Sequence, residues 1–192
     1  MGRQIVIAIA VACLALAAPL HAGSDWRYAL DPASSDVRAK VGFLGLASKT
    51  ARFPAVSGTI RLDPRQPEAI ALDVTLDARA LRAGDPVTLQ RLKGPQFFHV
   101  EQYPTVRFLG RSMTMTGARS AKVAGELTTR GVTRREVLQV TFDRPPTAED
   151  RKPVGLVGTM QIDRRAYGMT AWGGIVGNKV TITIRTRMVP EG

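Results

Sequence analysis

The chain has 192 residues, of which 44% are hydrophobic and 6% aromatic, and its 27 Lys and Arg against 16 Asp and Glu give a formal net charge of +11. Beyond residue 22 it has no cysteine, and His99 is its only histidine. For that part of the chain, this excludes a thiol nucleophile, c-type haem attachment and a zinc site built from several Cys or His side chains.

The first 22 residues have the composition of a secretory signal peptide. Arg3 is their only charged residue, and Ile5 to Leu20 is almost wholly apolar. This is a short positive region followed by an apolar stretch too short to span a bilayer comfortably. Cleavage after Ala22 then predicts a periplasmic protein with one domain at residues 23–192. The alternatives are a retained membrane anchor and a lipoprotein signal at Cys13.

Six segments then alternate apolar and polar residues with a period of two, and a seventh runs from Thr105 to Leu109. The apolar positions are, in chain order, Val37, Ala39, Val41 and Phe43; Val56, Gly58, Ile60 and Leu62; Ile70, Leu72, Val74 and Leu76; Leu138, Val140 and Phe142; Val154, Leu156, Met160 and Ile162; and Val180, Ile182 and Ile184. Such alternation predicts strands with one buried and one solvated face. Seven or eight strands with short turns predict an all-β fold, either an antiparallel sandwich or a closed barrel.

The hydrophobic pattern predicts no long helix and no linker between domains. Short helical pieces are expected at 78–83 and 89–100, where the alternation lapses. The polar segment 143–153 resembles a linker, but only some forty residues with about two strands follow it. This is too little for a second domain, so the segment is expected to be a loop.

The pattern gives little support to catalysis. A Ser-His-Asp triad would need His99 as its base, and no nucleophile-elbow pattern surrounds a serine. The Gly-rich segment 172–178 lacks a Lys-Ser/Thr ending and precedes a strand, so it does not fit a phosphate-binding loop. We therefore expect no catalytic residue and no metal site, with His99 at the surface or at a helix end.

The positive charge favours anionic partners in general. The basic residues are spread over alternate strand positions, which is typical of a solvated outer face. Single-strand nucleic-acid binders place aromatic residues among basic ones, whereas Phe43, Phe108 and Phe142 fall on the apolar faces here. Nucleic-acid binding is therefore not expected.

The inside of a barrel is the remaining place for a function. An eight-stranded barrel either fills its interior with side chains or holds one ligand. The small inward residues Ala39, Gly58 and Gly158 could leave a tunnel or serve close packing, and the residues alone leave both readings open. A tunnel lined in this way would select a long hydrocarbon over a sugar or a nucleotide.

Three segments carry a family resemblance. The first, GPQFFHVEQYPTVRFLG at 94–110, joins the Phe97-Phe98 pair to a turn at Tyr103-Pro104 and a strand; the others are GELTTRGVT at 125–133 and IDRRAYGM at 162–169. In this order, in a small exported β-rich chain, they resemble the YceI-like family of polyisoprenoid-binding proteins. The resemblance implies a single antiparallel eight-stranded lipocalin-like barrel with short helical segments. It also implies a polyisoprenoid or isoprenoid-quinone ligand in the pore, and no other cofactor, no metal and no established catalytic residue.

The pore-lining candidates combine the inward strand positions with the aromatic residues of the family segments. They are Val41, Phe43, Ile60, Leu72, Val74, Leu92, Phe97, Phe98, Phe108, Leu138, Val140, Phe142, Ile162, Tyr167, Met169, Trp172 and Ile182. Three departures from the family pattern lie near the expected barrel mouth. The family often has His in place of Phe43, an Arg-Asp-x-His-Leu motif in place of residues 88–92, and Asp in place of His99.

The sequence thus predicts a non-catalytic periplasmic carrier that holds a long isoprenoid or isoprenoid-quinone lipid in its pore. Two alternatives stay open. One is a solid-cored barrel that binds a membrane redox protein through its basic surface, and the other is an enzyme on an isoprenoid substrate with His99 as base. Transient contact with a membrane surface is compatible with either binding role. The oligomeric state is left open, a dimer included.

Overall fold

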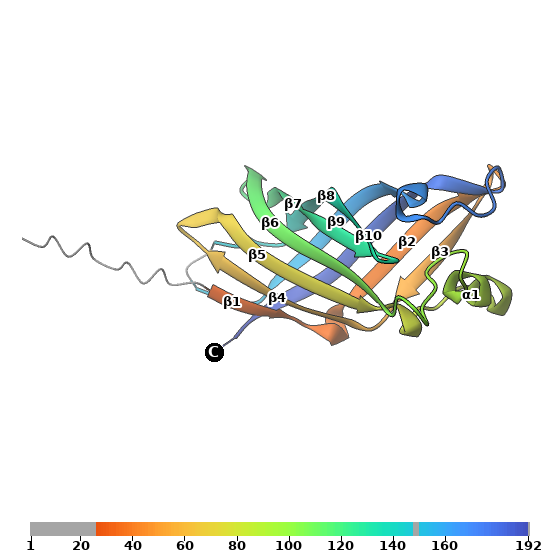
Figure 1. Ribbon diagram of the computed structural model, residues 1–192. Helices are drawn as coiled ribbons and strands as arrows, with labels where there is room; N and C mark the ends of the chain where they lie inside the picture. Colours follow the sequence, from red (N-terminus) through yellow and green to blue (C-terminus); the bar gives the residue numbers. More distant parts are fainter. Residues whose placement is uncertain (1–25, 148–149, 192) are drawn as a thin grey trace, which may run out of the picture.

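The computed structural model describes residues 26–147 and 150–191, and these residues form mainly antiparallel strands (Figure 1). The predicted signal peptide lies outside the described residues. The strands are β1 (Trp26–Leu30), β2 (Asp36–Phe43), β3 (Ala47–Phe53), β4 (Val56–Asp63), β5 (Gln66–Asp77), β6 (Thr105–Gly117), β7 (Ser120–Thr129), β8 (Val132–Phe142), β9 (Val154–Asp163) and β10 (Val176–Pro190). The helix α1 spans Pro86–Lys93, and the 3-10 turns η1, η2 and η3 span Pro32–Ser34, Ala78–Ala80 and Arg164–Tyr167.

The strands close into a barrel. Neighbours follow the order β1-β4-β5-β6-β7-β8-β9-β10-β2-β3, and a further pairing of β1 with β10 completes the ring. The pair β1–β2 behaves as one strand bent at η1, and β3–β4 as a second bent at Pro54, so eight strands surround the interior. Of the two folds that the alternation allowed, the closed eight-stranded barrel is confirmed.

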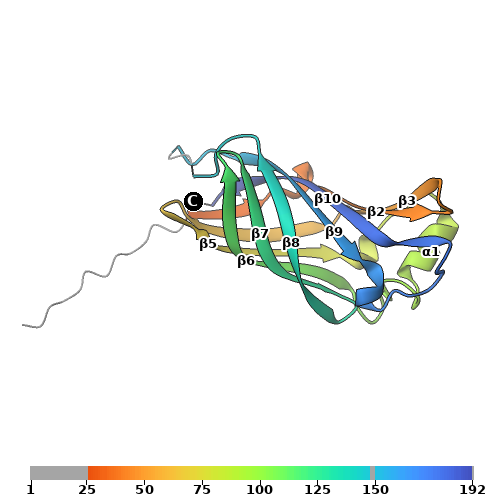
Figure 2. The same ribbon diagram turned by 90° about the horizontal axis from the view of Figure 1, so that it is seen from above.

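The two ends of the barrel differ in construction. Strand β3 pairs with β2 along its length, but within the described part of the chain its other edge makes only an isolated bridge between Arg52 and Arg82. Figures 1 and 2 show the β2–β3 tip, α1 and the β9–β10 loop together at one end, which we call the mouth. The turns β4–β5 and β6–β7 and the β8–β9 loop lie at the opposite end.

The helical segments are shorter than the sequence predicted. The expected helix at 78–83 is the single 3-10 turn η2, and the expected helix at 89–100 is wrong at both boundaries. Helix α1 begins earlier because Asp85 caps it, with its Oδ1 accepting from the Thr88 N–H at 2.8 Å, and because Pro86 suits the first turn. It ends at Lys93 with Gly94 as the C-cap, and turns continue to Gln102.

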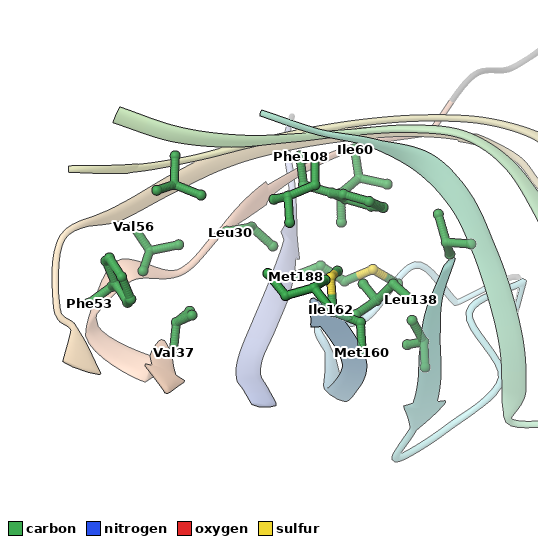
Figure 3. Packing of buried hydrophobic residues seen from close by; sticks show 14 of the residues in the cluster. Leu30, Val37, Phe53, Val56, Ile60, Phe108, Leu138, Met160, Ile162 and Met188 are labelled. Atoms are coloured by element: carbon green, nitrogen blue, oxygen red, sulfur yellow. The ribbon is translucent and has the colours of Figure 1, made fainter. Parts of the chain in front are cut away.

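The inward positions of the strands build one apolar core. In Figure 3, Phe108 and Ile60 project from one wall towards Met160 and Met188 on the other. Two of the small inward residues serve close packing. A Cβ at Gly58 would lie 2.9 Å from Leu30 Cδ1, and a Cβ at Gly158 would lie 3.1 Å from Leu138 Cδ1. Neighbouring side chains therefore already fill the space beside both glycines.

Candidate functional site

The first cavity, which we call the inner cavity, lies in the half of the barrel away from the mouth and has a volume of about 100 Å³. Its walls are Leu30, Val37, Ile60, Leu62, Ile70, Leu72, Val74, Leu76, Val106, Phe108, Met113, Val123, Leu127, Leu138, Val140, Phe142, Pro146, Leu156, Met160, Ile182, Ile184, Thr186 and Met188. Thr186 is the only polar side chain in this set, and its hydroxyl lies 2.6 Å from Ser35 Oγ. The inner cavity can therefore offer a ligand little besides hydrocarbon contact.

The second cavity, which we call the mouth-side cavity, has a volume of about 90 Å³. It is lined by Val37, Ala39, Val41, Lys49, Thr50, Ala51, Phe53, Leu76, Leu92, Phe97, Phe98, Val106, Leu127, Thr129, Ile162, Arg164, Met169, Val176, Val180 and Ile182. Five residues line both cavities and form the waist of the interior: Val37, Leu76, Val106, Leu127 and Ile182. The two cavities thus adjoin along the barrel.

A third hollow, of about 190 Å³, continues from the mouth-side cavity to the surface. Phe97 lines both spaces and is only 7% exposed, so its ring lies between them. Trp172 borders the outer hollow, where its Nε1 donates to Gln96 Oε1 at 3.0 Å and the Arg91 guanidinium lies 4.4 Å from its ring centroid. A ligand that reaches the interior from this end would have to pass the residues that line both spaces: Val41, Lys49, Leu92, Phe97 and Val176.

Most of the predicted pore-lining residues border these spaces. The inner cavity is lined by Ile60, Leu72, Val74, Phe108, Leu138, Val140 and Phe142, and the mouth-side cavity by Val41, Leu92, Phe97, Phe98, Ile162 and Met169. Ile182 lines both cavities, and the outer hollow is bordered by Phe43 and Trp172. Tyr167 lines none of the three. Its ring is fully buried beside β8, and its hydroxyl donates to Glu136 Oε1 at 2.7 Å.

Arg164 is a buried, charged residue in the wall of the mouth-side cavity, and the sequence analysis did not predict it as a pore-lining residue. It is 2% exposed, and its guanidinium donates to the carbonyls of Met169, Ala171, Val176 and Gly177. Burial lowers the pKa of this group, although the nearby Asp163 carboxylate opposes the change. Because backbone carbonyls already occupy its donors, Arg164 holds the β9–β10 loop in place and has little left to offer a ligand.

Two other polar groups of this cavity are better placed to meet a ligand. Lys49 projects inward from β3, with its Nζ 2.9 Å from Asp85 Oδ2 and 5.4 Å from the Phe43 ring centroid. The hydrogen bond from Lys49 and those from Thr88 hold the pKa of the Asp85 carboxyl well below its usual range. The Thr129 hydroxyl is buried and has no hydrogen-bond partner among the described residues. It could therefore bond to a ligand without losing a protein partner.

Comparison with known proteins gives the family. Residues 28–188 match the YceI-like domain family. The chain belongs to the YceI-like family. This confirms the resemblance in the three sequence segments, and the match covers the barrel from β1 to β10. A relative from Pseudomonas savastanoi, named UPF0312 protein, is 25% identical over 178 residues, which cover 90% of this chain and 91% of the relative.

Solved structures show the same fold as this YceI-like chain. BcnA from Burkholderia cenocepacia aligns with a TM-score of 0.73 at 23% identity, over 82% of this chain and 98% of that one. A domain from Saccharophagus degradans, described as a polyisoprenoid binding domain, aligns with a TM-score of 0.66 at 14% identity, over 85% of this chain and 98% of its own.

Two of the three departures from the YceI-like pattern border the outer hollow. Phe43 and the segment 88–92, through Thr88, Arg91 and Leu92, line it, whereas His99 lines neither cavity. His99 has a φ of +49° in the turn after α1, and its ring meets Tyr103 edge-on at 5.9 Å. Within residues 26–147 and 150–191, no three His, Cys, Asp or Glu side chains gather as metal ligands would. The same residues include no helix long and apolar enough to cross a bilayer.

Proposed function

We propose that this protein is a non-catalytic periplasmic carrier that holds the hydrocarbon chain of an isoprenoid or isoprenoid-quinone lipid inside the barrel. The observation that carries the proposal is the row of two adjoining cavities, almost wholly apolar at the inner end and open to polar groups only towards the mouth. A long tail with one polar end fits this gradient. The description of the Saccharophagus domain as polyisoprenoid-binding supports the same ligand class.

The driving force would be the burial of hydrocarbon. Ten buried methylene-sized groups contribute roughly 8 kcal/mol before ordering costs, at about 0.8 kcal/mol each. That gross value corresponds to roughly micromolar affinity. No catalytic group is needed for such binding, and His99 lies outside both cavities, which disfavours the enzyme alternative.

The cavities are small for a long isoprenoid, so their walls must move when the lipid enters. Methionine is the residue best suited to this, because its unbranched side chain has three rotatable bonds and adapts to irregular spaces. Met113, Met160 and Met188 line the inner cavity, and Met169 lines the mouth-side cavity. Displacement of these side chains would widen both cavities on either side of the waist, and displacement of Phe97 would open the mouth-side cavity towards the outer hollow.

Lipid extraction tests the proposal directly. The protein is purified from its native periplasm and extracted with organic solvent, and the extract is compared by mass spectrometry with the amount of denatured protein. We expect a polyprenyl or quinone species in stoichiometric amount. An empty extract, together with no uptake of added polyprenol or quinone by the purified protein, would contradict the carrier function.

One observation favours the interaction-partner alternative. A groove of about 890 Å³ runs over the outer face of β2, β3 and β10 and is lined by Arg38, Lys40, Arg52, Arg82 and Arg185, with Asp85 as its only acidic residue. Such a surface suits an acidic partner. If the extraction fails, capture of an acidic membrane redox protein would favour this alternative, provided that charge reversal at Arg52 and Arg185 abolishes the capture.

A further inference from the structure

The exposed apolar side chains of this protein gather at the mouth. Among the described residues, seven large apolar side chains are exposed, and five of them lie in the β2–β3 tip, α1 or the β9–β10 loop: Leu44, Leu46, Val87, Trp172 and Ile175. The other two, Val137 and Val157, lie on the outer wall of the barrel, on β8 and β9. Isolated exposed apolar residues are common, but a group at one end of a molecule calls for an explanation.

The exposed apolar residues of the mouth lie on neighbouring segments around one opening. The Leu44 N–H donates to the Ile175 carbonyl at 2.8 Å, and the Ile175 N–H donates to the Trp172 carbonyl at 3.1 Å. Trp172 in turn borders the outer hollow with Val87. Leu46 completes the three-residue tip and is 102% exposed, so it makes almost no contact with the rest of the protein.

The backbone at these tips is held in conformations that favour glycine. Leu44 has a φ of +52° and Trp172 a φ of +61°. Large side chains seldom adopt such angles, and a non-glycine residue there carries a conformational cost. Both positions carry exposed apolar side chains where a glycine or an asparagine would have suited the backbone and the solvent better. The backbone conformation therefore does not account for Leu44 or Trp172, although Trp172 also contacts Gln96 and Arg91.

Basic residues lie just behind the apolar tips. A surface hollow next to Leu46 is lined by Lys40 and Lys179, and Arg91 borders the outer hollow beside Trp172. Asp85 is the only acidic residue among the walls of the hollows at this end, and Lys49 already pairs with it at 2.9 Å. At about 3.3 Å of rise per strand residue, Lys40 lies roughly 13 Å behind Leu44.

We propose that the mouth docks on an anionic lipid bilayer, with Leu44, Leu46 and Ile175 in the boundary between headgroups and acyl chains. Apolar groups of this kind enter a membrane surface by about 5–10 Å. At that depth Lys40, Lys179 and Arg91 reach the level of the lipid phosphates, and Trp172 takes the interfacial position that tryptophan prefers. This docking points the opening of the barrel at the membrane, and it does not depend on which cargo the pore holds.

Charge and shape favour a bilayer over a protein partner or a second copy. The apolar residues sit on separate tips around an opening, where a fluid surface can receive each tip without a matching shape. The cationic setting complements anionic lipid, whereas a second copy would bring like charges together. Self-association through the same tips nevertheless remains an outcome that the experiment must distinguish.

Vesicle binding with site-specific labels tests the proposal. The full gene is expressed and the processed protein is purified from the periplasm, with its intact mass measured because residues 5–20 would themselves bind lipid. Since the chain has no cysteine beyond Cys13, Leu46→Cys and Arg65→Cys each provide one site for an environment-sensitive fluorophore. Arg65 is exposed in the β4–β5 turn, at the end opposite the mouth. The probes are vesicles of equal parts phosphatidylglycerol and phosphatidylcholine, and vesicles of phosphatidylcholine alone.

We expect the label at position 46 to enter an apolar environment on anionic vesicles, while the label at position 65 stays in water. The double variant Leu44→Asn and Leu46→Ser should weaken vesicle binding by about tenfold or more. Asn adopts the positive φ at position 44 more readily than Leu, so circular dichroism should not change and the thermal midpoint should not fall. The matched control, Val137→Ser with Val157→Ser, removes exposed apolar surface from the barrel wall and should leave vesicle binding unchanged.

Three results would overturn the docking proposal. The first is no binding to anionic vesicles by the folded protein at low salt. The second is an equal response of the two labels, or equal loss in the tip and wall variants, since either would mean unspecific adsorption by the positive surface. The third is a wild-type dimer that the tip variant makes monomeric, with vesicle binding absent. None of these depends on whether lipid is found in the extraction experiment, so the two proposals can fail separately.

Discussion

The two halves of the barrel interior are built from the same strands but differ in what closes them. Around the inner cavity, regular antiparallel ladders complete the wall, and the one polar side chain, Thr186, is bonded to Ser35. Around the mouth-side cavity, β3 is an edge strand, so helix α1 and loops complete the wall in place of a further strand. Polar side chains, such as Lys49 and Thr129, line this cavity. The comparison indicates that the inner half selects for hydrocarbon, while the mouth half decides what polar end is tolerated and how a ligand enters.

The largest effect on stability is expected from a substitution that removes the hydrogen bonds holding the β9–β10 loop in the mouth half. Arg164→Ala removes the donor to four carbonyls, two in the β9–β10 loop and two at the start of β10. It should lower the free energy of unfolding by roughly 3 kcal/mol, because buried carbonyls then lose their partner. Denaturant unfolding measures the loss. Hydrogen exchange should show faster exchange at 169–177, with the β7–β8 ladder near the inner cavity changed least.

The neighbouring arginine is the matched control for this substitution. Arg165 is exposed and pairs with Asp163 at 2.6 Å, so Arg165→Ala should leave the free energy of unfolding nearly unchanged, because solvent screens an exposed ion pair. Equal losses for the two variants would show that the guanidinium of Arg164 is not what holds the loop, and the mouth half would then owe its structure to the apolar contacts of Met169 and Tyr167.

A smaller effect, on lipid binding, is expected from a substitution that blocks the passage between the inner cavity and the mouth-side cavity. Ile182 lines both cavities at the waist, and Ile182→Trp should fill the passage between them. A long isoprenoid could then enter only the mouth-side cavity, so its retention should fall by about tenfold or more, which corresponds to about 1.4 kcal/mol. Short-chain analogues should be affected less, because they do not need the inner cavity. Mass spectrometry of bound lipid, over a series of chain lengths, measures this.

Thr183→Trp provides the control at the adjacent position. Thr183 lines the outer groove, on the other face of β10, so this variant adds the same indole without entering the pore. It should retain lipid as the wild type does. If the two variants lose lipid equally, or if Ile182→Trp affects all chain lengths alike, the ligand does not pass the waist and the tail does not lie in the inner cavity.

Period-two alternation accounts for what the sequence could predict. Where large apolar residues alternate with polar ones, as on β2, β5 and β8, the buried face follows from the pattern alone. On β3 and β7 it does not. Lys49 points inward on β3, and on β7 the inward face includes Gly125, where a Cβ would lie 2.8 Å from Phe108 Cζ. The Phe108 ring of the neighbouring strand β6 fills the place of a side chain there, and this arrangement is visible only once the strands are paired.

The polar groups of the mouth half could not be predicted from the sequence either, because their partners also come together only in the folded chain. Alternation continued past Ile162 points position 164 inward, but an arginine is ordinarily assigned to the surface. The carbonyls that receive its guanidinium come from the β9–β10 loop and the start of β10, up to 13 residues further along the chain. The existence of the cavities is also a tertiary property. Gly58 and Gly158 allowed a tunnel but serve packing, whereas the space that remains arises where side chains of facing walls fail to meet.

The smallest expected effect compares one threonine from each half, and the two should differ in sign. Thr129→Val removes a buried hydroxyl that has no partner among the described residues, so it should stabilise the lipid-free protein by about 1 kcal/mol. Thr186→Val removes a hydroxyl that lies 2.6 Å from Ser35 Oγ, so it should destabilise the protein by about the same amount. Denaturant unfolding of lipid-free protein measures both.

Lipid binding by the same two variants sharpens the comparison further. If a polar ligand end lies in the mouth half, Thr129→Val should weaken retention of a polyprenol or a quinone relative to a plain hydrocarbon of equal length, because only the former can bond to the hydroxyl. Thr186→Val should shift the two ligands equally, since only the tail reaches the inner half. The reverse result, with Thr186 distinguishing the ligands and Thr129 not, would mean that the lipid lies in the barrel with its polar end away from the mouth.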